Sequence, residues 1–246
     1  GVELAEDLQR IAMNVGPDTI AACFVEPIAG STGVLVPPVG YLERLREICD
    51  MHGILLVFDE VICGIGRTGK VFAAHSFGVT PDLITMAKAL TNGAVPMAAI
   101  AVKDNIYETV VNASPKNAIE MFHGYTYSGH PVACAAGLAA LNIYEKEDLF
   151  KRAEALSPYF LEQVYSLQDL EVVTDIRGYG LIAGFDVAQG AAPGVRGTQL
   201  QKDLFWNGMH IKFTGDVGII APPFVSEKAD IDSMIDILRQ TLEKMG

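Results

Sequence analysis

The chain has 246 residues, 50% hydrophobic and 20% charged, so it has the apolar content of a folded core that disordered chains lack. Its 30 acidic and 18 basic residues give a net charge of −12, which argues against a nucleic-acid partner because the phosphate backbone would be repelled. No apolar run approaches the roughly 18 residues of a membrane span, so we expect no membrane partner.

The four cysteines lie far apart in the sequence, without the CxxC or Cys/His spacing of a zinc site. We therefore expect reduced thiols, no metal site and a cytoplasmic protein. The first residues, GVELAEDLQR, are acidic and amphipathic and do not resemble a signal peptide.

Helical and strand periods alternate from residue 1 to about 103, which predicts an α/β fold with a mainly parallel sheet. Leu4, Leu8 and Ile11 have helical spacing, and a second amphipathic helix over residues 40–52 ends at Gly53, a residue suited to a helix C-cap. The expected strands are TIAACFVEP, which we expect to be buried, ILLVFDEV, LITMA and MAAIAV. Ligands in such sheets bind beyond the carboxyl ends of the strands.

The second half of the chain predicts a different arrangement. Residues 104–122 look loop-like, a small-residue helix follows over 132–147, and charge density rises near residue 146. After a helix over 151–167, residues 171–188 indicate a hairpin, and 188–197 form a Gly/Pro-rich loop. Another helix, two short strands and a terminal amphipathic helix complete the pattern. We expect a large domain over 1–146 and a smaller α+β domain over 147–246.

The segment from Gly64 to Gly69 matches the GxGxxG pattern of dinucleotide-binding loops. Such a loop must open directly into a helix that faces the pyrophosphate, and the following KVFAAHSFGVTPD shows no sustained helical period. A tight turn that needs positive φ is therefore the favoured interpretation.

Asp59 and Glu60 close an apolar strand, and Lys88 follows the apolar run LITMA. Spacing alone is weak evidence, because acids often end strands and a lysine can extend to the surface. Lys88 however lies in MAKALTNGAVPMAAIA, an apolar setting in which a protonated amine is costly. A Schiff-base lysine needs such an environment.

Six segments occur in this order along the chain: FVEPIAGSTGV, VFDEVICGIGRTGK, PDLITMAKALTNGAVPM, HGYTYSGHPVACAAGLAAL, IRGYGL and GDVGIIAPPF. Together they resemble the class III aminotransferases, which depend on pyridoxal phosphate and have fold type I. The similarity is strongest to the omega-amino-acid:pyruvate (beta-alanine:pyruvate) group and covers essentially the whole chain.

The resemblance implies a role for several residues of the cofactor site. It assigns Lys88 as the Schiff-base lysine and Asp59 as the catalytic partner of the pyridine nitrogen, where a carboxylate keeps the nitrogen protonated. Val61 corresponds to the apolar residue against one ring face. Glu26 matches the family's EP motif as a more remote cofactor-site residue, although a carboxylate that only fixes a loop is equally consistent.

Tyr125 and Thr126 match a segment that, in the family, reaches the cofactor phosphate of the other subunit. This implies a homodimer with shared active sites. A polar turn before the helix near Pro131 would explain the same residues.

Four positions depart from related enzymes and bear on the substrate. Ornithine- and GABA-type members carry Glu, Gln and Arg where this chain has Ser31, Ile62 and Ile219, so polar anchoring for glutamate-like substrates is lost. Lys212 stands where the omega-amino-acid group has a mobile Arg. Lysine retains the charge that binds a carboxylate but not the bidentate geometry, and an exposed lysine without a role is an equal alternative.

The family's N-terminal region has no counterpart here, so we expect a fragment, a processed piece or one half of a split enzyme, with an incomplete large domain. In a split enzyme, a separate N-terminal chain is the expected partner. The implied activity is ping-pong transfer of an amino group from an omega-amino acid or amine to pyruvate. A decarboxylase or aminomutase of the same class, or a non-catalytic fragment that needs a complementary chain, are the alternatives.

Overall fold

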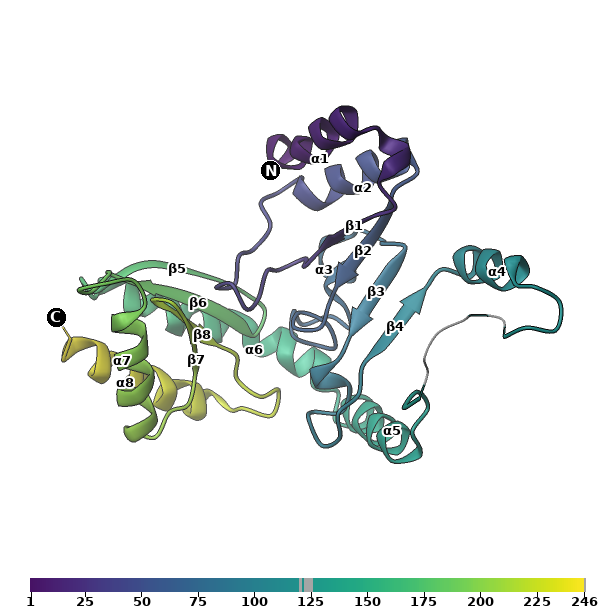
Figure 1. Cartoon of the computed structure of the whole chain (residues 1–246). Helices are drawn as coiled ribbons and strands as arrows, with labels where there is room; N and C mark the ends of the chain where they lie inside the picture. Colours follow the sequence, from purple (N-terminus) through teal and green to yellow (C-terminus); the bar gives the residue numbers. More distant parts are fainter. Residues whose placement is uncertain (120, 122–125, 246) are drawn as a thin grey trace.

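The computed structural model describes residues 1–119, 121 and 126–245 and contains two four-stranded sheets, each covered by helices (Figure 1). The first sheet has the order β1 (Ala22–Val25), β2 (Leu55–Asp59), β3 (Leu83–Met86) and β4 (Ala99–Val102). Its first three strands are parallel and β4 is antiparallel to β3. The second sheet, in the order β5-β6-β8-β7, is antiparallel throughout. The predicted α/β fold class is confirmed.

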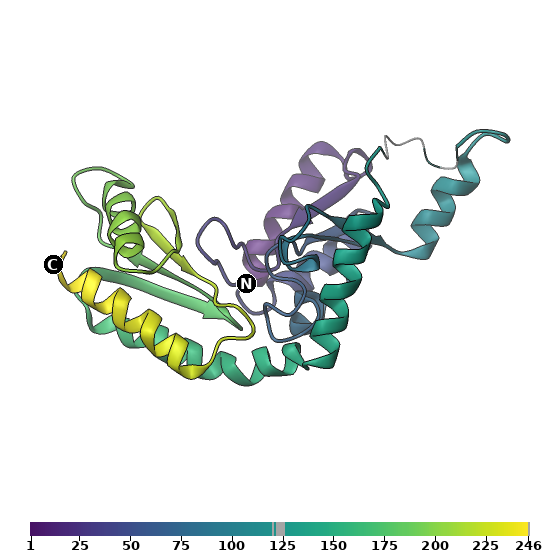
Figure 2. The same ribbon diagram turned by 90° about the horizontal axis from the view of Figure 1, so that it is seen from below.

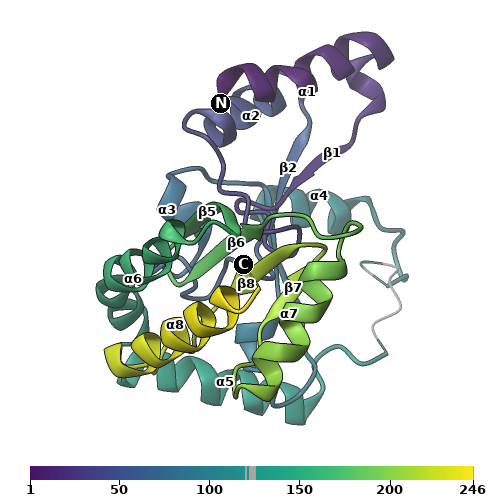
Figure 3. The same ribbon diagram turned by 90° about the vertical axis from the view of Figure 1, so that its left-hand side faces the viewer.

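Helices α1 (Val2–Val15) and α2 (Tyr41–His52) lie side by side over the first sheet (Figure 3). Their apolar side chains form one core with the strands, which includes Ala5 and Ala12 of α1 and Leu42, Leu45 and Ile48 of α2. Gly53 ends α2 in the left-handed conformation, with φ of 66°, as its position predicts. The short helices η1 (Pro17–Thr19), α3 (Ala73–Phe77) and η2 (Lys88–Leu90) lie in the connections.

The second sheet contains β5 (Val173–Tyr179), β6 (Ile182–Val187), β7 (Lys212–Thr214) and β8 (Val217–Ile220). The predicted hairpin is confirmed by the antiparallel pairing of β5 and β6. Helices α6 (Leu149–Tyr165) and α8 (Lys228–Glu243) run side by side along this sheet (Figure 2). They pack around a second core with α5 (Pro131–Lys146), η3 (Ser166–Asp169) and α7 (Val195–Trp206). The expected domain boundary at residue 146 coincides with the end of α5 and stays a prediction.

Two local expectations are wrong. Residues 104–113, expected to be loop-like, form helix α4 (Asp104–Ala113), because Ile106, Tyr107 and Val110 have helical spacing that the polar residues between them obscure. Strand β1 is not fully buried, since Phe24 is 71% exposed. Alternate residues of β1 point to opposite faces, and α1 and α2 cover only the face that carries Cys23 and Val25.

A third apolar cluster joins the two sheets. Ile28 and Val34 from the loop after β1 and Cys63 from the loop after β2 pack against Ile182 of β6. The hydroxyl of Thr214 in β7 also donates a hydrogen bond of 2.8 Å to the carbonyl oxygen of Ser31. The loops at the carboxyl ends of β1 and β2 are thereby attached to the second sheet. In the described part of the chain, no helix combines the length and the hydropathy needed to cross a membrane.

Asp82 lies at the opposite end of the first sheet, where three groups donate hydrogen bonds to its carboxylate. Desolvation opposes ionisation, but hydrogen bonds from Lys103, the Leu56 N–H and Arg46 outweigh it and lower the pKa of Asp82. The three distances to the carboxylate are each 2.8 Å. The folded protein therefore binds a proton at Asp82 less readily than the unfolded chain does, and acid weakens this contribution to stability.

We expect Asp82→Asn to lower the free energy of unfolding at pH 7 by about 2 kcal/mol, because it leaves Arg46 without its more buried partner. The difference from the wild type should persist above about pH 5 and shrink as the pH falls below about 3.9, the ordinary aspartate pKa. Urea unfolding at several pH values measures it. Asp50→Asn removes the exposed partner of the same arginine and should cost under about 0.5 kcal/mol. Equal effects of the two variants would contradict the prediction.

Candidate active site

The parallel pairing of β2 and β3 brings Asp59 and Lys88 to the same edge of the first sheet. Asp59 is the last residue of β2 and is opposite Thr85 in the register, three residues before Lys88. Because both strands run in one direction, the chain leaves both at their carboxyl ends, where parallel sheets bind ligands. The structure therefore places the acid and the lysine at the same end of neighbouring strands.

The carboxylate of Asp59 is held by its neighbours through one oxygen. Oδ1 accepts hydrogen bonds from the Thr85 hydroxyl at 3.0 Å and from the Val61 N–H at 3.1 Å. Within the described part of the chain, no hydrogen bond reaches Oδ2. One oxygen thus fixes the orientation of the carboxylate, and the other is free to accept a hydrogen bond from a cationic N–H.

Lys88 begins η2 with a φ of 44°, a left-handed conformation that lysine rarely adopts. Such backbone strain is found mainly at functional sites, where the surrounding structure maintains it. The amine forms no ion pair with any described residue. The side chain is exposed, so the enclosed apolar environment expected from the sequence is not formed by the described residues. The apolar neighbours of Lys88 in sequence, Met86 and Leu90, pack instead into the core formed around the second sheet.

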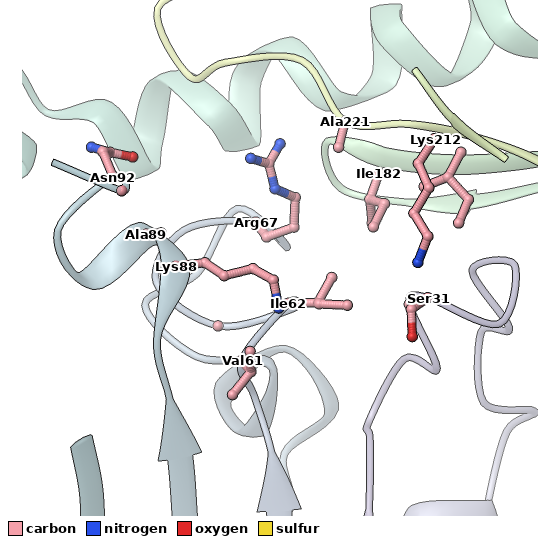
Figure 4. Close-up of a pocket in the computed structure, with 14 residues that line it drawn as sticks. Ser31, Val61, Ile62, Arg67, Lys88, Ala89, Asn92, Ile182, Lys212 and Ala221 are labelled. Atoms are coloured by element: carbon pink, nitrogen blue, oxygen red, sulfur yellow. The ribbon is translucent and has the colours of Figure 1, made fainter. Parts of the chain in front are cut away.

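A cavity of about 590 Å³ lies between the first sheet and the second, and both Lys88 and Lys212 reach it (Figure 4). Val61 and Ile62 from the loop after β2 form part of its wall, as does Ile182 of β6. The complete lining consists of Gly30, Ser31, Val61, Ile62, Gly64, Arg67, Lys88, Ala89, Asn92, Gly93, Ile182, Lys212, Ile219 and Ala221. The cavity thus combines residues from both halves of the chain.

The charge of this cavity is opposite to that of the chain as a whole. Arg67, Lys88 and Lys212 line it, and no aspartate or glutamate does so among the described residues. The chain as a whole carries a net charge of −12. Three cations without acidic neighbours in the lining attract anionic groups such as carboxylate and phosphate.

Arg67 is held deep in the wall of the cavity. Its guanidinium donates hydrogen bonds to the carbonyl oxygens of Leu181 at 2.9 Å and Pro222 at 2.7 Å, and it lies 4.7 Å from the centre of the Phe224 ring. Burial lowers the pKa of Arg67 to about 10, an effect that Tyr144 partly opposes. Arg67 therefore stays cationic at neutral pH while it connects the loop after β2 to the second sheet.

The positions at which this chain departs from related enzymes lie together in space. Ser31, Ile62 and Ile219 all line the cavity. Lys212 is opposite Ile219 in the register of β7 and β8, and its amine points toward Ser31 (Figure 4). Two isoleucines therefore form an apolar wall at positions where the resemblance leads us to expect polar side chains, and Lys212 lies next to them.

Two other predicted residues lie away from this cavity. Oε2 of Glu26 accepts a hydrogen bond of 2.9 Å from the Gly30 N–H, an arrangement that fixes the loop after β1. Thr126 borders a different pocket of about 870 Å³ with Met97 and His130, and Tyr125 is outside the described residues. The structure therefore brings Val61, Lys88 and Lys212 to one cavity, with Asp59 hydrogen-bonded to Val61 beside it, and places Glu26 and Thr126 outside the lining.

Several cavity residues are not predicted by the sequence pattern. The pattern indicates Arg67 only as part of a tight turn, although a single cation inside a glycine-rich loop between two candidate site residues is a usable signal. Asn92 and Ile182 also line the cavity, and their spacing gave no indication of it. Ile182 comes from the second sheet, so its approach to Lys88 depends on a contact between residues far apart in the sequence.

The glycine-rich loop itself forms the expected turn. Gly66 and Gly69 have φ of 90° and 85°. A Cβ atom on Gly66 would lie 2.5 Å from the Phe150 ring, so the position requires glycine for space as well as conformation. Helix α3, which follows, has five residues and its first N–H groups bind the buried Glu60 carboxylate at 2.6 and 2.8 Å. The loop therefore does not present a helix N-terminus to a dinucleotide.

Known proteins match nearly the full length of the chain. It is 51% identical to an omega-aminotransferase of Caulobacter vibrioides over 98% of its own length and 55% of that protein. It is 46% identical to the omega-amino acid–pyruvate aminotransferase of Pseudomonas putida, over 100% of this chain and 55% of the relative. The chain thus spans about half the length of these relatives.

Solved structures agree with the sequence relatives. The omega transaminase of Pseudomonas jessenii, solved in complex with PMP, matches with a TM-score of 0.94 and 33% identity over 98% of this chain and 55% of that one. A transaminase solved with L-alanine matches with a TM-score of 0.95 and 34% identity, over 99% of this chain and 59% of that one. The family model for class-III aminotransferases matches residues 2–242. The chain therefore belongs to the class III aminotransferase family.

Proposed function

We propose that this chain provides the lysine-bearing part of a transaminase that moves an amino group from an omega-amino acid or amine to pyruvate. The observation that carries the proposal is the common cavity of Lys88, Val61 and Lys212, at the sheet edge where Asp59 ends its strand. The family and the names of the sequence relatives support transamination over decarboxylation or isomerisation.

The residues at this edge suit pyridoxal phosphate, on which class III aminotransferases depend. Lys88 offers an amine without a described ion pair, and Asp59 offers a free carboxylate oxygen next to a fixed one. Val61 provides an apolar surface on the cavity wall. When bound, the cofactor supplies an electron-accepting ring that stabilises negative charge on the substrate carbon.

Each residue then has a distinct task. Asp59 would hold the ring nitrogen of the cofactor and keep it protonated. Lys88 would hold the cofactor, and its Nζ would take up the proton from the substrate carbon. Ile62, Ile182 and Ile219 exclude water from one side of the cavity. Lys212 binds the substrate carboxylate.

A homodimer with shared active sites is part of the proposal, and so is a cytoplasmic location. In a dimer, Tyr125 and Thr126 would contact the cofactor phosphate of the partner subunit, and Glu26 would support the loop beside the site. Thr126 borders a pocket separate from that of Lys88, which is consistent with a contact to the cofactor of the partner subunit. All four cysteines are free, as expected in a reducing compartment.

Product analysis tests the proposed reaction. The complete protein, with any chain that precedes residue 1, is incubated with pyridoxal phosphate, beta-alanine and pyruvate. We expect alanine to form in proportion to the beta-alanine consumed, without carbon dioxide. Release of carbon dioxide, or an isomeric amino acid in place of alanine, would instead indicate a decarboxylase or an aminomutase.

Lys212→Met tests how the substrate is anchored. We expect KM for beta-alanine to rise about tenfold with little change in kcat. The variant loses one ion pair to the substrate carboxylate, and this ion pair stabilises the bound substrate and the transition state equally. An amine donor without a carboxylate should be unaffected. Lys202→Met, an exposed lysine on α7 outside this cavity, is the matched control. An unchanged KM for beta-alanine would show that Lys212 does not bind the substrate carboxylate.

A further inference from the structure

Lys88 lies in a backbone segment whose conformation needs support. Lys88 and Asn92 both have left-handed φ values, 44° and 50°, although neither is glycine. Within residues 87–96, the N–H groups of Leu90, Thr91 and Ala94 donate hydrogen bonds to the carbonyl oxygens of Ala87, Lys88 and Thr91 at 2.9, 3.2 and 3.1 Å, and the Thr91 hydroxyl donates one to Val95 O at 2.7 Å. These bonds are local, so the two strained residues keep one position relative to the rest of the fold only if other elements support the segment.

Tyr144 of α5 provides support from outside the segment. Its hydroxyl donates a hydrogen bond of 2.6 Å to the carbonyl oxygen of Ala89, the residue after Lys88. In the described part of the chain, this is the one hydrogen bond that another element makes to the backbone of residues 87–96. Tyr144 is 3% exposed and lies on the face of α5 that carries Gly137, where the helix backbone approaches Leu90 and Met97.

The ring of Tyr144 is itself fixed by aromatic neighbours. It lies 5.2 Å from the Phe150 ring and 6.0 Å from the Phe224 ring, centre to centre. The Arg67 guanidinium lies over the Phe224 ring and donates hydrogen bonds to the carbonyl oxygens of Leu181 and Pro222, which adjoin strands of the second sheet. Burial raises the pKa of Tyr144, while Asn92 and Arg67 lower it in part, so the hydroxyl is a protonated donor at neutral pH.

We propose that Tyr144 is a positioning residue for Lys88: its hydroxyl fixes the Ala89 carbonyl and thereby sets where the Lys88 amine enters the cavity. The inference rests on the proposed function of Lys88. Tyr144 contacts no group that would react, since it does not line the cavity, and it acts through the backbone of the neighbouring residue. Proton transfer by a lysine is sensitive to position, and an error of about 1 Å can cost about 100-fold in rate.

Tyr144→Phe removes the hydroxyl and keeps the ring, so the contacts with Phe150 and Phe224 are retained. Tyr165→Phe is the matched control, because Tyr165 is 42% exposed at the end of α6. Both variants are made in the complete protein with any chain that precedes residue 1. Two measurements are compared with the wild type: amide hydrogen exchange of the cofactor-free protein, and steady-state transamination of beta-alanine with pyruvate.

In Tyr144→Phe we expect the Leu90 and Thr91 amides to exchange about fivefold faster, with exchange elsewhere unchanged. We also expect kcat to fall about tenfold while KM stays within twofold, because positioning acts on the chemical step. The proposal would be overturned if exchange at these two amides were unchanged or if exchange became faster throughout the chain. A change in KM as large as the fall in kcat would overturn it too. If no variant, nor the wild type, forms alanine, the proposed function fails, and the exchange result still decides whether Tyr144 supports the segment.

Discussion

Replacement of Lys88 by alanine should reduce transamination of beta-alanine and pyruvate at least about 1,000-fold, the scale of a lost general base that also holds the cofactor. The side chain is exposed and has no described ion pair, so its removal should leave the fold intact. Alanine formation by the complete protein gives the rate, and thermal unfolding of the same samples gives Tm. A loss of activity with unchanged Tm would show that the variant is impaired in catalysis and not in folding.

The control for this variant is Lys70→Ala. Lys70 lies in the connection after β2, and its amine pairs with Glu154 at 2.6 Å on the surface. Exposed pairs of this kind contribute little to stability, and Lys70 is not part of the cavity lining. Activity within twofold of the wild type is expected for Lys70→Ala. If Lys88→Ala retained more than a tenth of the wild-type rate, another group would have to move the proton.

Asp59→Asn should produce the second largest loss, about 100- to 1,000-fold in kcat, the scale of a lost electrostatic partner at a reacting group. The amide oxygen of asparagine can still accept the hydrogen bonds that Thr85 and the Val61 N–H now give to Oδ1. The shape of the site is therefore kept while its negative charge is removed, and a neutral amide no longer keeps a ring nitrogen protonated.

The rate is measured as alanine formed from beta-alanine and pyruvate, and cofactor binding by the change in its absorption spectrum. Asp203→Asn serves as the matched control, because Asp203 lies on α7 and its carboxylate accepts a hydrogen bond from Gln199 outside the cavity. A rate for Asp59→Asn within a factor of five of the wild type would show that the charge of Asp59 is not needed. Equal losses in both aspartate variants would point to a general effect of charge.

Local sequence patterns predicted those features that depend on near neighbours. The alternation of helical and strand periods indicated the parallel strands, and the family resemblance assigned Asp59 and Lys88 to one site, which is consistent with the parallel pairing of β2 and β3. Gly53 ends its helix as expected, because a left-handed C-cap depends on one residue and the turn before it. The hairpin over β5 and β6 followed from two β-rich runs around a short turn.

Contacts between distant residues could not be predicted in this way. Tyr144 reaches the carbonyl of Ala89 across 55 residues, and no periodicity in either segment indicates that pairing. The exposure of Phe24 depends on which helices cover each face of β1, which the apolar run itself does not determine. The exposure of Lys88 has the same origin, since the side chains that could enclose its amine come from other elements.

Reduction with borohydride and peptide mapping provide the most direct test of the central claim, that Lys88 holds pyridoxal phosphate. The complete protein is loaded with the cofactor, reduced, digested and analysed by mass spectrometry. We expect the cofactor mass on one peptide, attached to Lys88, and its absence when Lys88→Ala is treated in the same way. Attachment at any other lysine in the wild-type protein would contradict the assignment of the site.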